Sequence, residues 1–181
     1  KKINLTVGVY KDETGQTLAI SRDEIVLNDW AATDLGATLG DEIVVTYYEP
    51  ETTHGELREA PPLRLKLKAI VPLADDQGQP TTAADPTLTP ELPGVTDQAS
   101  ISDWDLPFEL VEEIRPQDED YWDDFRTTPK AFVALETAEQ LWHTRWGTVS
   151  ALRFPEGTSQ QDIAQLAAEL DPPQLGLAWL P

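Results

Sequence analysis

The chain has 181 residues, of which 40% are hydrophobic, and 33 acidic residues against 13 basic ones give it a formal net charge of −20. This length and composition suit one packed domain, or two small subdomains that share a core, and argue against wholesale disorder. Such an acidic surface disfavours binding to nucleic acid and to anionic lipid, and the absence of cysteine excludes disulfides, thiol catalysis and cysteine-based metal sites.

The first 74 residues predict the first half of a core domain. Residues 3–10 alternate in the manner of a strand. Residues 24–48 indicate a strand, a short helix capped by Asn28 and ended by Gly36, a turn, and a second strand. Residues 63–71 alternate leucine with arginine or lysine, which is the clearest strand pattern in the chain. The polar, proline-containing stretch between these last two strands is typical of a hairpin connection.

Residues 75–129 have a different composition. They hold 15 acidic residues against Arg115 and Arg126, and seven of the 15 prolines. Proline prevents long regular elements, so we expect an ordered but irregular insertion with one short helix at residues 117–126. Its acidic start and Arg126 at its end suit the helix dipole.

Residues 130–181 predict the second half of the core. A strand at 130–135 leads to a short helix for which Thr137 is the expected cap. A strand at 148–154 follows, then an amphipathic helix capped by Ser159, and a closing strand at 175–180. The whole pattern predicts an α+β fold, with a mixed sheet built from two βαβ-like halves and helices on one side. The insertion is expected to form a second lobe.

No apolar run approaches the length of a membrane span, and no signal-peptide pattern opens the chain. The sequence also contains no methionine. These features predict that the chain is a soluble segment of a longer protein.

Two blocks of this sequence resemble one known family. Residues 24–48 read EIVLNDWAATDLGATLGDEIVVTYY and are followed by LKLKAIVPL; beyond the insertion come AFVALETAEQLW, TVSALRFPEG and the amphipathic helix. These motifs resemble the extracytoplasmic domain of FtsX-like (MacB-type) ABC-transporter permeases, over about two-thirds of the chain. The acidic, proline-rich insertion departs from the better-known MacB-type members, so their periplasmic adaptor is not carried over as a partner.

The resemblance implies a non-catalytic domain on the outer, periplasmic side of the bacterial cytoplasmic membrane, between the first two membrane helices of the permease. Its implied partners are the transmembrane helices of its own chain and, indirectly, the ATP-binding subunit. A periplasmic protein or a transported substrate would be contacted outside the membrane. No cofactor is implied, and nothing in the sequence resembles a phosphate-binding loop. The alternative is a secreted module that binds carbohydrate or Ca²⁺.

Aromatic residues of the insertion and of the following helix are the candidate partner-binding residues, because interface cores favour tryptophan and tyrosine. An exposed aromatic patch in this acidic region would suit a peptide, a lipid or a sugar. The candidates are Trp104, Phe108, Tyr121, Trp122, Trp142 and Trp146.

Residues 118–124, DEDYWDD, are the strongest candidate for local chemistry, because clustered carboxylates can bind Ca²⁺. The spacing of an EF-hand is absent, and a solvated acidic helix end is the favoured interpretation. Paired carboxylates beside Trp104 and Trp122 could also serve a glycosidase, but 33 acidic residues produce such pairs by chance. His54 and His143 accompany no hydrolase motif, so catalysis is not expected.

Overall fold

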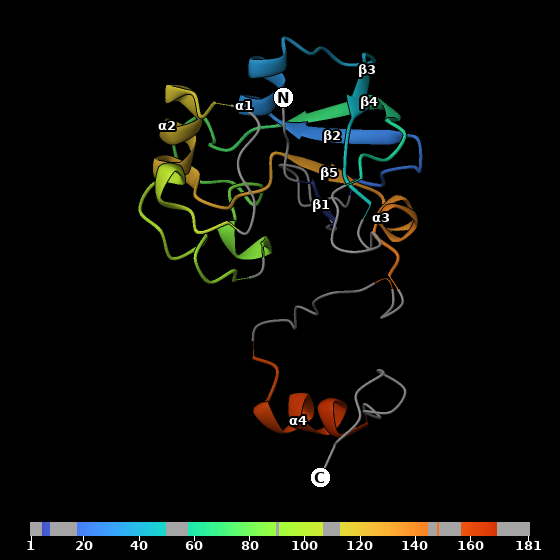
Figure 1. Cartoon of the computed structure of the whole chain (residues 1–181), viewed down its shortest axis with the longest axis vertical. Helices are drawn as coiled ribbons and strands as arrows, with labels where there is room; N and C mark the ends of the chain where they lie inside the picture. Colours follow the sequence, from blue (N-terminus) through green and yellow to red (C-terminus); the bar gives the residue numbers. More distant parts are fainter. Residues whose placement is uncertain are drawn as a thin grey trace.

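The computed structural model describes residues 5–7, 18–49, 58–89, 91–106, 113–144, 148 and 157–169. Residues of α1 and α3 pack on one face of the sheet and residues of α2 on the other; Figure 1 shows α2 and α3 on opposite sides of the sheet in that view. The strands are β1 (Leu5–Val7), β2 (Glu24–Asn28), β3 (Glu42–Val45), β4 (Leu63–Val71) and β5 (Ala131–Val133). The helices are α1 (Asp29–Leu35), α2 (Pro116–Phe125), α3 (Leu135–Leu141) and α4 (Gln160–Glu169), with short 3₁₀ turns η2 (Pro86–Leu88) and η3 (Ile101–Asp103).

The five strands among the described residues lie in the order β1-β5-β2-β4-β3. The pairs β2–β4 and β1–β5 are parallel, whereas β2–β5 and β3–β4 are antiparallel. The mixed sheet with helices confirms the α+β prediction. Strands from the first and the last part of the chain are neighbours at β2–β5, so the chain on both sides of the insertion builds one sheet.

Local sequence signals account for α1 and for β4. The Asn28 side chain accepts a hydrogen bond from the Ala31 N–H at 2.7 Å, and Gly36 ends the helix with φ of 65°. Only glycine adopts that left-handed conformation without strain from a Cβ, so both predicted boundaries are confirmed. Strand β4 has the predicted bounds, and its antiparallel pairing with β3 confirms the hairpin.

The predicted cap of α3 is wrong. Ala134 occupies the N-cap position of α3 and makes no side-chain capping bond. Thr137 lies inside the helix, where its hydroxyl donates to the Arg22 carbonyl at 2.9 Å. Thr137 is 4% exposed, so its buried hydroxyl needs a hydrogen-bond partner, and it finds one in a distant backbone group instead of at the helix end. The Ser159 cap of α4 is confirmed by its bond from the Asp162 N–H.

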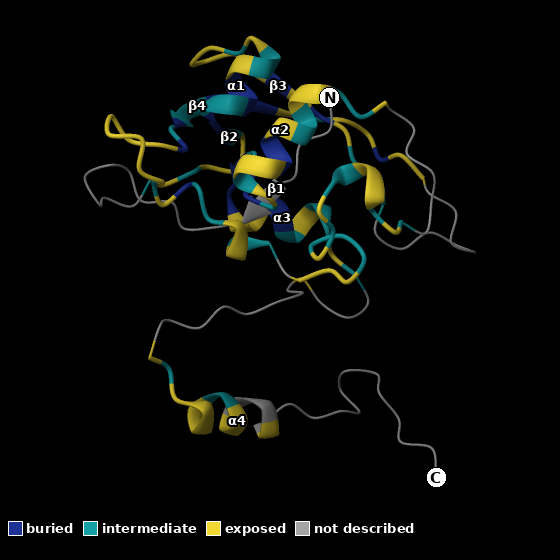
Figure 2. Ribbon diagram, turned by 90° about the vertical axis from the view of Figure 1, so that its left-hand side faces the viewer, coloured by how far each residue is buried: buried dark blue, intermediate teal, exposed yellow. Residues whose placement is uncertain are grey.

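Other predicted elements differ or lie outside the described residues. The predicted strand through Tyr48 ends at Val45 and continues only as an isolated bridge from Tyr48 to Glu59. Most of the predicted strand at 148–154 and all of that at 175–180 fall outside the described residues. The described part of the insertion is irregular with one longer helix, α2, close to its predicted position. Helix α4 lies apart from the sheet in both views (Figures 1 and 2).

The core has two parts, one on each face of the sheet. Alternation along β2 directs Ile25 and Leu27 to the face covered by α1 and α3, and Val26 to the opposite face. Phe132 of β5 joins Val26 there, with Ala83 and Tyr121 of the insertion. Figure 2 shows the buried residues gathered between these layers. The insertion therefore packs directly on the second face of the sheet.

Candidate functional site

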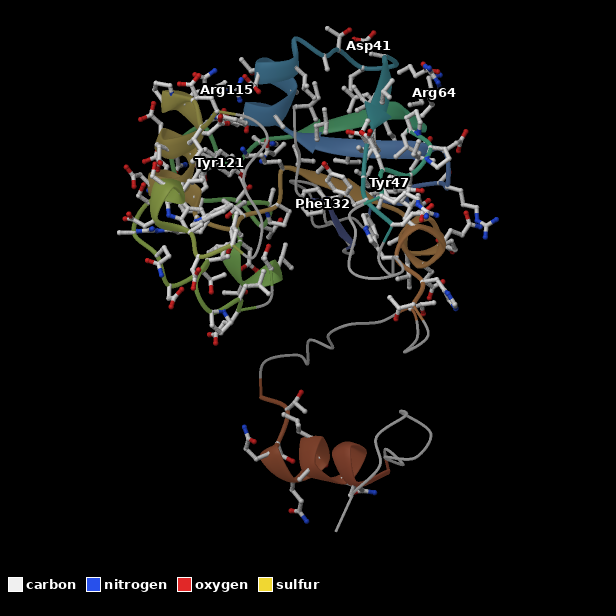
Figure 3. All side chains as sticks on the ribbon, in the orientation of Figure 1. Asp41, Tyr47, Arg64, Arg115, Tyr121 and Phe132 are labelled. Atoms are coloured by element: carbon white, nitrogen blue, oxygen red, sulfur yellow. The ribbon has the colours of Figure 1, made fainter. Side chains whose placement is uncertain are left out.

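The insertion meets the rest of the domain at a cluster of polar and aromatic side chains that we name the polar junction. It joins three parts of the chain: the end of β2 with α1, the start of the insertion helix α2, and the segment that enters β5. Figure 3 shows two of its members, Arg115 and Tyr121, on the α2 side of the sheet. Its members are Asn28, Trp30, Asp34, Arg115, Asp118, Tyr121 and Lys130.

Asn28 is the centre of the polar junction and is fully buried. Besides capping α1, it donates from Nδ2 to the Tyr121 hydroxyl at 3.0 Å and to the Pro129 carbonyl at 3.1 Å. The Tyr121 hydroxyl in turn donates to the Thr128 carbonyl at 2.9 Å. Burial raises the pKa of Tyr121, so the phenol stays protonated and keeps this donor. One asparagine thus fixes α1, α2 and the entry to β5 relative to each other.

Arg115 bridges α1 and α2 by charge. Its guanidinium donates to both carboxylate oxygens of Asp34, each at 3.0 Å, and to those of Asp118 at 2.7 and 2.8 Å. These hydrogen bonds raise the pKa of Arg115, and the bond from Arg115 holds the pKa of Asp118 below its usual range. The Arg115 side chain is 33% exposed and that of Asp34 is 15% exposed, so water screens the bridge only in part.

Lys130 completes the polar junction from the β5 side. Its Nζ lies 4.1 Å from the centre of the Trp30 ring and 4.4 Å from that of Tyr121. It also lies 3.8 Å from an oxygen of Asp118. Burial lowers the pKa of Lys130, while the nearby carboxylate opposes this effect. Two aromatic faces and one carboxylate offset the cost of placing the cation there.

A groove lies beside the polar junction, between α1 and α2. Its apolar lining comes from Trp30, Leu73, Ala74 and Phe125, and its volume is about 480 Å³. The polar residues that line it are Asp29, Thr33, Asp34 and Gln117. A concave, mostly apolar surface with a few polar groups at its rim is the usual form of a binding site.

The rest of the described insertion is tied to α2. Trp122 donates from its indole nitrogen to the Ala99 carbonyl at 3.1 Å, and Arg126 donates to the same carbonyl. The Glu119 carboxylate accepts bonds from Ser100, Ser102 and the Ile101 N–H. Although burial opposes it, these bonds lower the pKa of Glu119. These hydrogen bonds therefore fix the segment around η3 to helix α2.

The four aromatic candidates that the structure describes do not form one exposed patch. Tyr121 is 4% and Trp122 is 3% exposed, so both belong to the core, which corrects the prediction for these two. Trp104 is half-buried and packs edge-on against Trp122, with ring centres 5.0 Å apart. Trp142 packs on the opposite, α1–α3 face of the sheet. Phe108 and Trp146 lie outside the described residues.

The acidic residues of α2 have different partners. Asp118 pairs with Arg115, and Glu119 binds the η3 segment. Among the described residues, no group of three or more acidic or histidine side chains is placed to hold a metal ion. The described carboxylates of this helix start act as anchors of the insertion.

Sequence reasoning missed Asn28, Asp34, Arg115 and Lys130 as members of one site. The cap at Asn28 was predictable, but its bonds to residues 93 and 101 positions away were not. One signal was present: Arg115 is one of only two cations in an acidic segment of 55 residues. A basic residue that is one of very few in an acidic segment is a candidate for an ion pair that stabilises the fold.

No model of a known protein family matches the chain, and comparisons with curated proteins and with solved structures give no significant match. None of the helices among the described residues has the length and apolar character that crossing a bilayer requires.

Proposed function

We propose that the chain is the non-catalytic extracytoplasmic domain of an FtsX-like, MacB-type ABC-transporter permease. In this role it couples the movement of the permease's own membrane helices to a partner or a substrate outside the cytoplasmic membrane. ATP hydrolysis takes place elsewhere, on the ATP-binding subunit, with which the domain communicates only through the membrane helices.

The observation that carries the proposal is the way the two resembling blocks combine. The first block contributes β2, α1, β3 and β4, and the second contributes β5 and α3. Their central strands β2 and β5 pair directly, with Val26 opposite Phe132. Apart from α4, the described elements of the two blocks thus form one framework across the insertion, as expected if both blocks belong to the same domain type.

The polar junction supplies a mechanical link from this framework to the insertion. Helix α1 follows β2 directly and is held to α2 by Arg115, while Asn28 holds Tyr121 and the entry to β5. A displacement of the sheet and α1 would therefore carry α2 with it, since two charge-assisted hydrogen bonds from Arg115 to Asp34 and the buried amide of Asn28 join them. Force that enters through membrane helices would reach the acidic surface of the insertion by this route.

The proposal is tested on the full-length gene product in cells. We expect it to fractionate with the inner membrane and to carry apolar segments of about 20 residues on both sides of this domain. Protease added to outer-membrane-permeabilised cells should cut within the domain, while the ATP-binding subunit stays intact until the inner membrane is lysed. A product that fractionates with soluble exported proteins would contradict the proposal.

The groove beside the polar junction favours a second candidate, a secreted binding module. The aromatic rings of Trp30 and Phe125 line this groove, and such an apolar surface also suits a carbohydrate. The same fractionation separates the two functions, since a secreted module needs no membrane segments. Titration of the chain with sugars and with Ca²⁺ would then be the next measurement.

A further inference from the structure

We infer that the groove between α1 and α2 is a docking site for a short basic and hydrophobic segment of a partner protein. This inference goes beyond the permease proposal and does not depend on it, because the binding it predicts can be measured on the 181-residue chain itself.

The apolar walls of the groove favour binding of an apolar side chain. Trp30 and Phe125 are only partly buried although both pack on the core, and beyond the end of β4 the exposed Ala74 adjoins them over the buried Leu73. A volume of about 480 Å³ is enough for two or three side chains of a bound peptide. Covering this surface would remove partly exposed aromatic rings from water, which favours association.

The negative charge around the groove favours a positively charged partner segment. Among the described residues that line it, the charged ones are Asp29 and Asp34. Along the same helix α2, the residues Asp120, Asp123 and Asp124 are exposed. Arg115 offsets the charge of Asp34, with which it pairs, so the negative excess beside the groove comes from Asp29 and from these three aspartates of α2. Lysine or arginine beside the apolar residue is the complementary chemistry.

Hydrogen bonds hold the elements on both sides of the groove. Asp29 accepts hydrogen bonds from the Trp30 N–H at 2.8 Å and from the Leu73 N–H at 3.3 Å, so it fixes the floor between α1 and the end of β4. The polar junction fixes the opposite wall, α2. A site whose walls are already held needs little ordering when the partner binds.

The test uses the 181-residue chain and two capped probe peptides, one of alternating lysine and leucine or phenylalanine, and one in which glutamate replaces each lysine. We expect the basic probe to bind, to shift the NMR signals of Trp30, Leu73 and Ala74, and to bind more weakly as salt increases. The glutamate probe should not bind. Binding of both probes alike, or shifts that spare these three residues, would overturn the inference.

A matched pair of variants separates the groove from general attraction to an acidic protein. Gln117 lines the groove on α2, and Gln140 lies on α3 at the other face of the sheet; both are exposed. Gln117→Lys should weaken binding of the basic probe about fivefold, whereas Gln140→Lys, with the same change in net charge, should leave it nearly unchanged. Equal weakening by both variants, or none by Gln117→Lys, would overturn the inference.

These outcomes are independent of the cell-fractionation result. A membrane-bound product with an inert groove would retain the permease proposal and remove the docking site. A secreted product whose groove binds the basic probe would retain the docking site and remove the permease proposal.

Discussion

One face of the sheet is covered by α1 and α3 with aliphatic and alanine side chains, whereas the other is covered by α2 and irregular chain of the insertion. The first layer is formed by residues such as Leu27, Leu65, Leu67 and Ala31, which recur at strand or helix spacing. The second layer depends on aromatic rings, a buried asparagine and charged bridges. The two layers should therefore respond differently to mutation, salt and pH.

The largest loss of stability is expected from a cavity in the aliphatic layer. Leu67 is 1% exposed, so Leu67→Ala should lower the free energy of unfolding by about 3 kcal/mol, at pH 4 as well as at pH 7. Urea unfolding measures this change. The control is Val44→Ala on the edge strand β3, where Val44 is 49% exposed and the loss should stay below about 0.5 kcal/mol. A pH-dependent loss at Leu67 would remove the distinction between the two layers.

The next effect is expected at the centre of the polar junction. Asn28→Ala removes the cap of α1 and both bonds from Nδ2, so it should cost about 2–3 kcal/mol. Asn28→Asp keeps an acceptor for Ala31 but cannot donate to the Pro129 carbonyl. If the long-range bonds matter, the aspartate variant should also be destabilised, as urea unfolding would show. If Asn28→Asp were as stable as the wild type, Asn28 would contribute to stability only as the cap of α1.

A smaller loss is expected from the charged bridge. Arg115→Ala leaves Asp34 and Asp118 without their shared cation and should cost about 2 kcal/mol, less in high salt. The matched control is Arg64→Ala, because Arg64 pairs with Glu42 where both side chains are more than half exposed. That loss should be below about 0.5 kcal/mol. Equal losses for the two arginines would show that the polar junction adds nothing beyond a surface pair.

The smallest effect is a dependence on acid pH. The pKa of Asp118 is lowered in the folded state by Arg115, so its contribution is complete above the unfolded value of about 3.9 and is lost as pH falls through the folded value. The stabilities of the wild type and of Asp118→Asn should therefore differ at pH 7 and converge as pH falls below about 4. Unfolding by urea between pH 2 and pH 7 measures both curves. Parallel curves would contradict this assignment.

The same contrast explains how much could be predicted from the sequence. Strand β4, the cap at Asn28 and the stop at Gly36 follow from alternation and from local chemistry within a few residues, and all were predictable. The layer formed by the insertion depends on contacts between positions far apart, such as Asn28 with Tyr121, and no local pattern reports them. For the same reason Tyr121 was listed as a candidate partner-binding residue, since no pattern in its acidic segment indicates that its ring packs against the sheet.

The central claim is that the polar junction couples the insertion to the sheet, and hydrogen exchange of the chain with Arg115→Ala tests it most directly. We predict that amide exchange becomes about tenfold faster in α2 and around η3, while β2 and β4 keep their protection, and that Arg64→Ala changes neither region. Unchanged protection in α2, or equal loss of protection across the sheet, would contradict the claim.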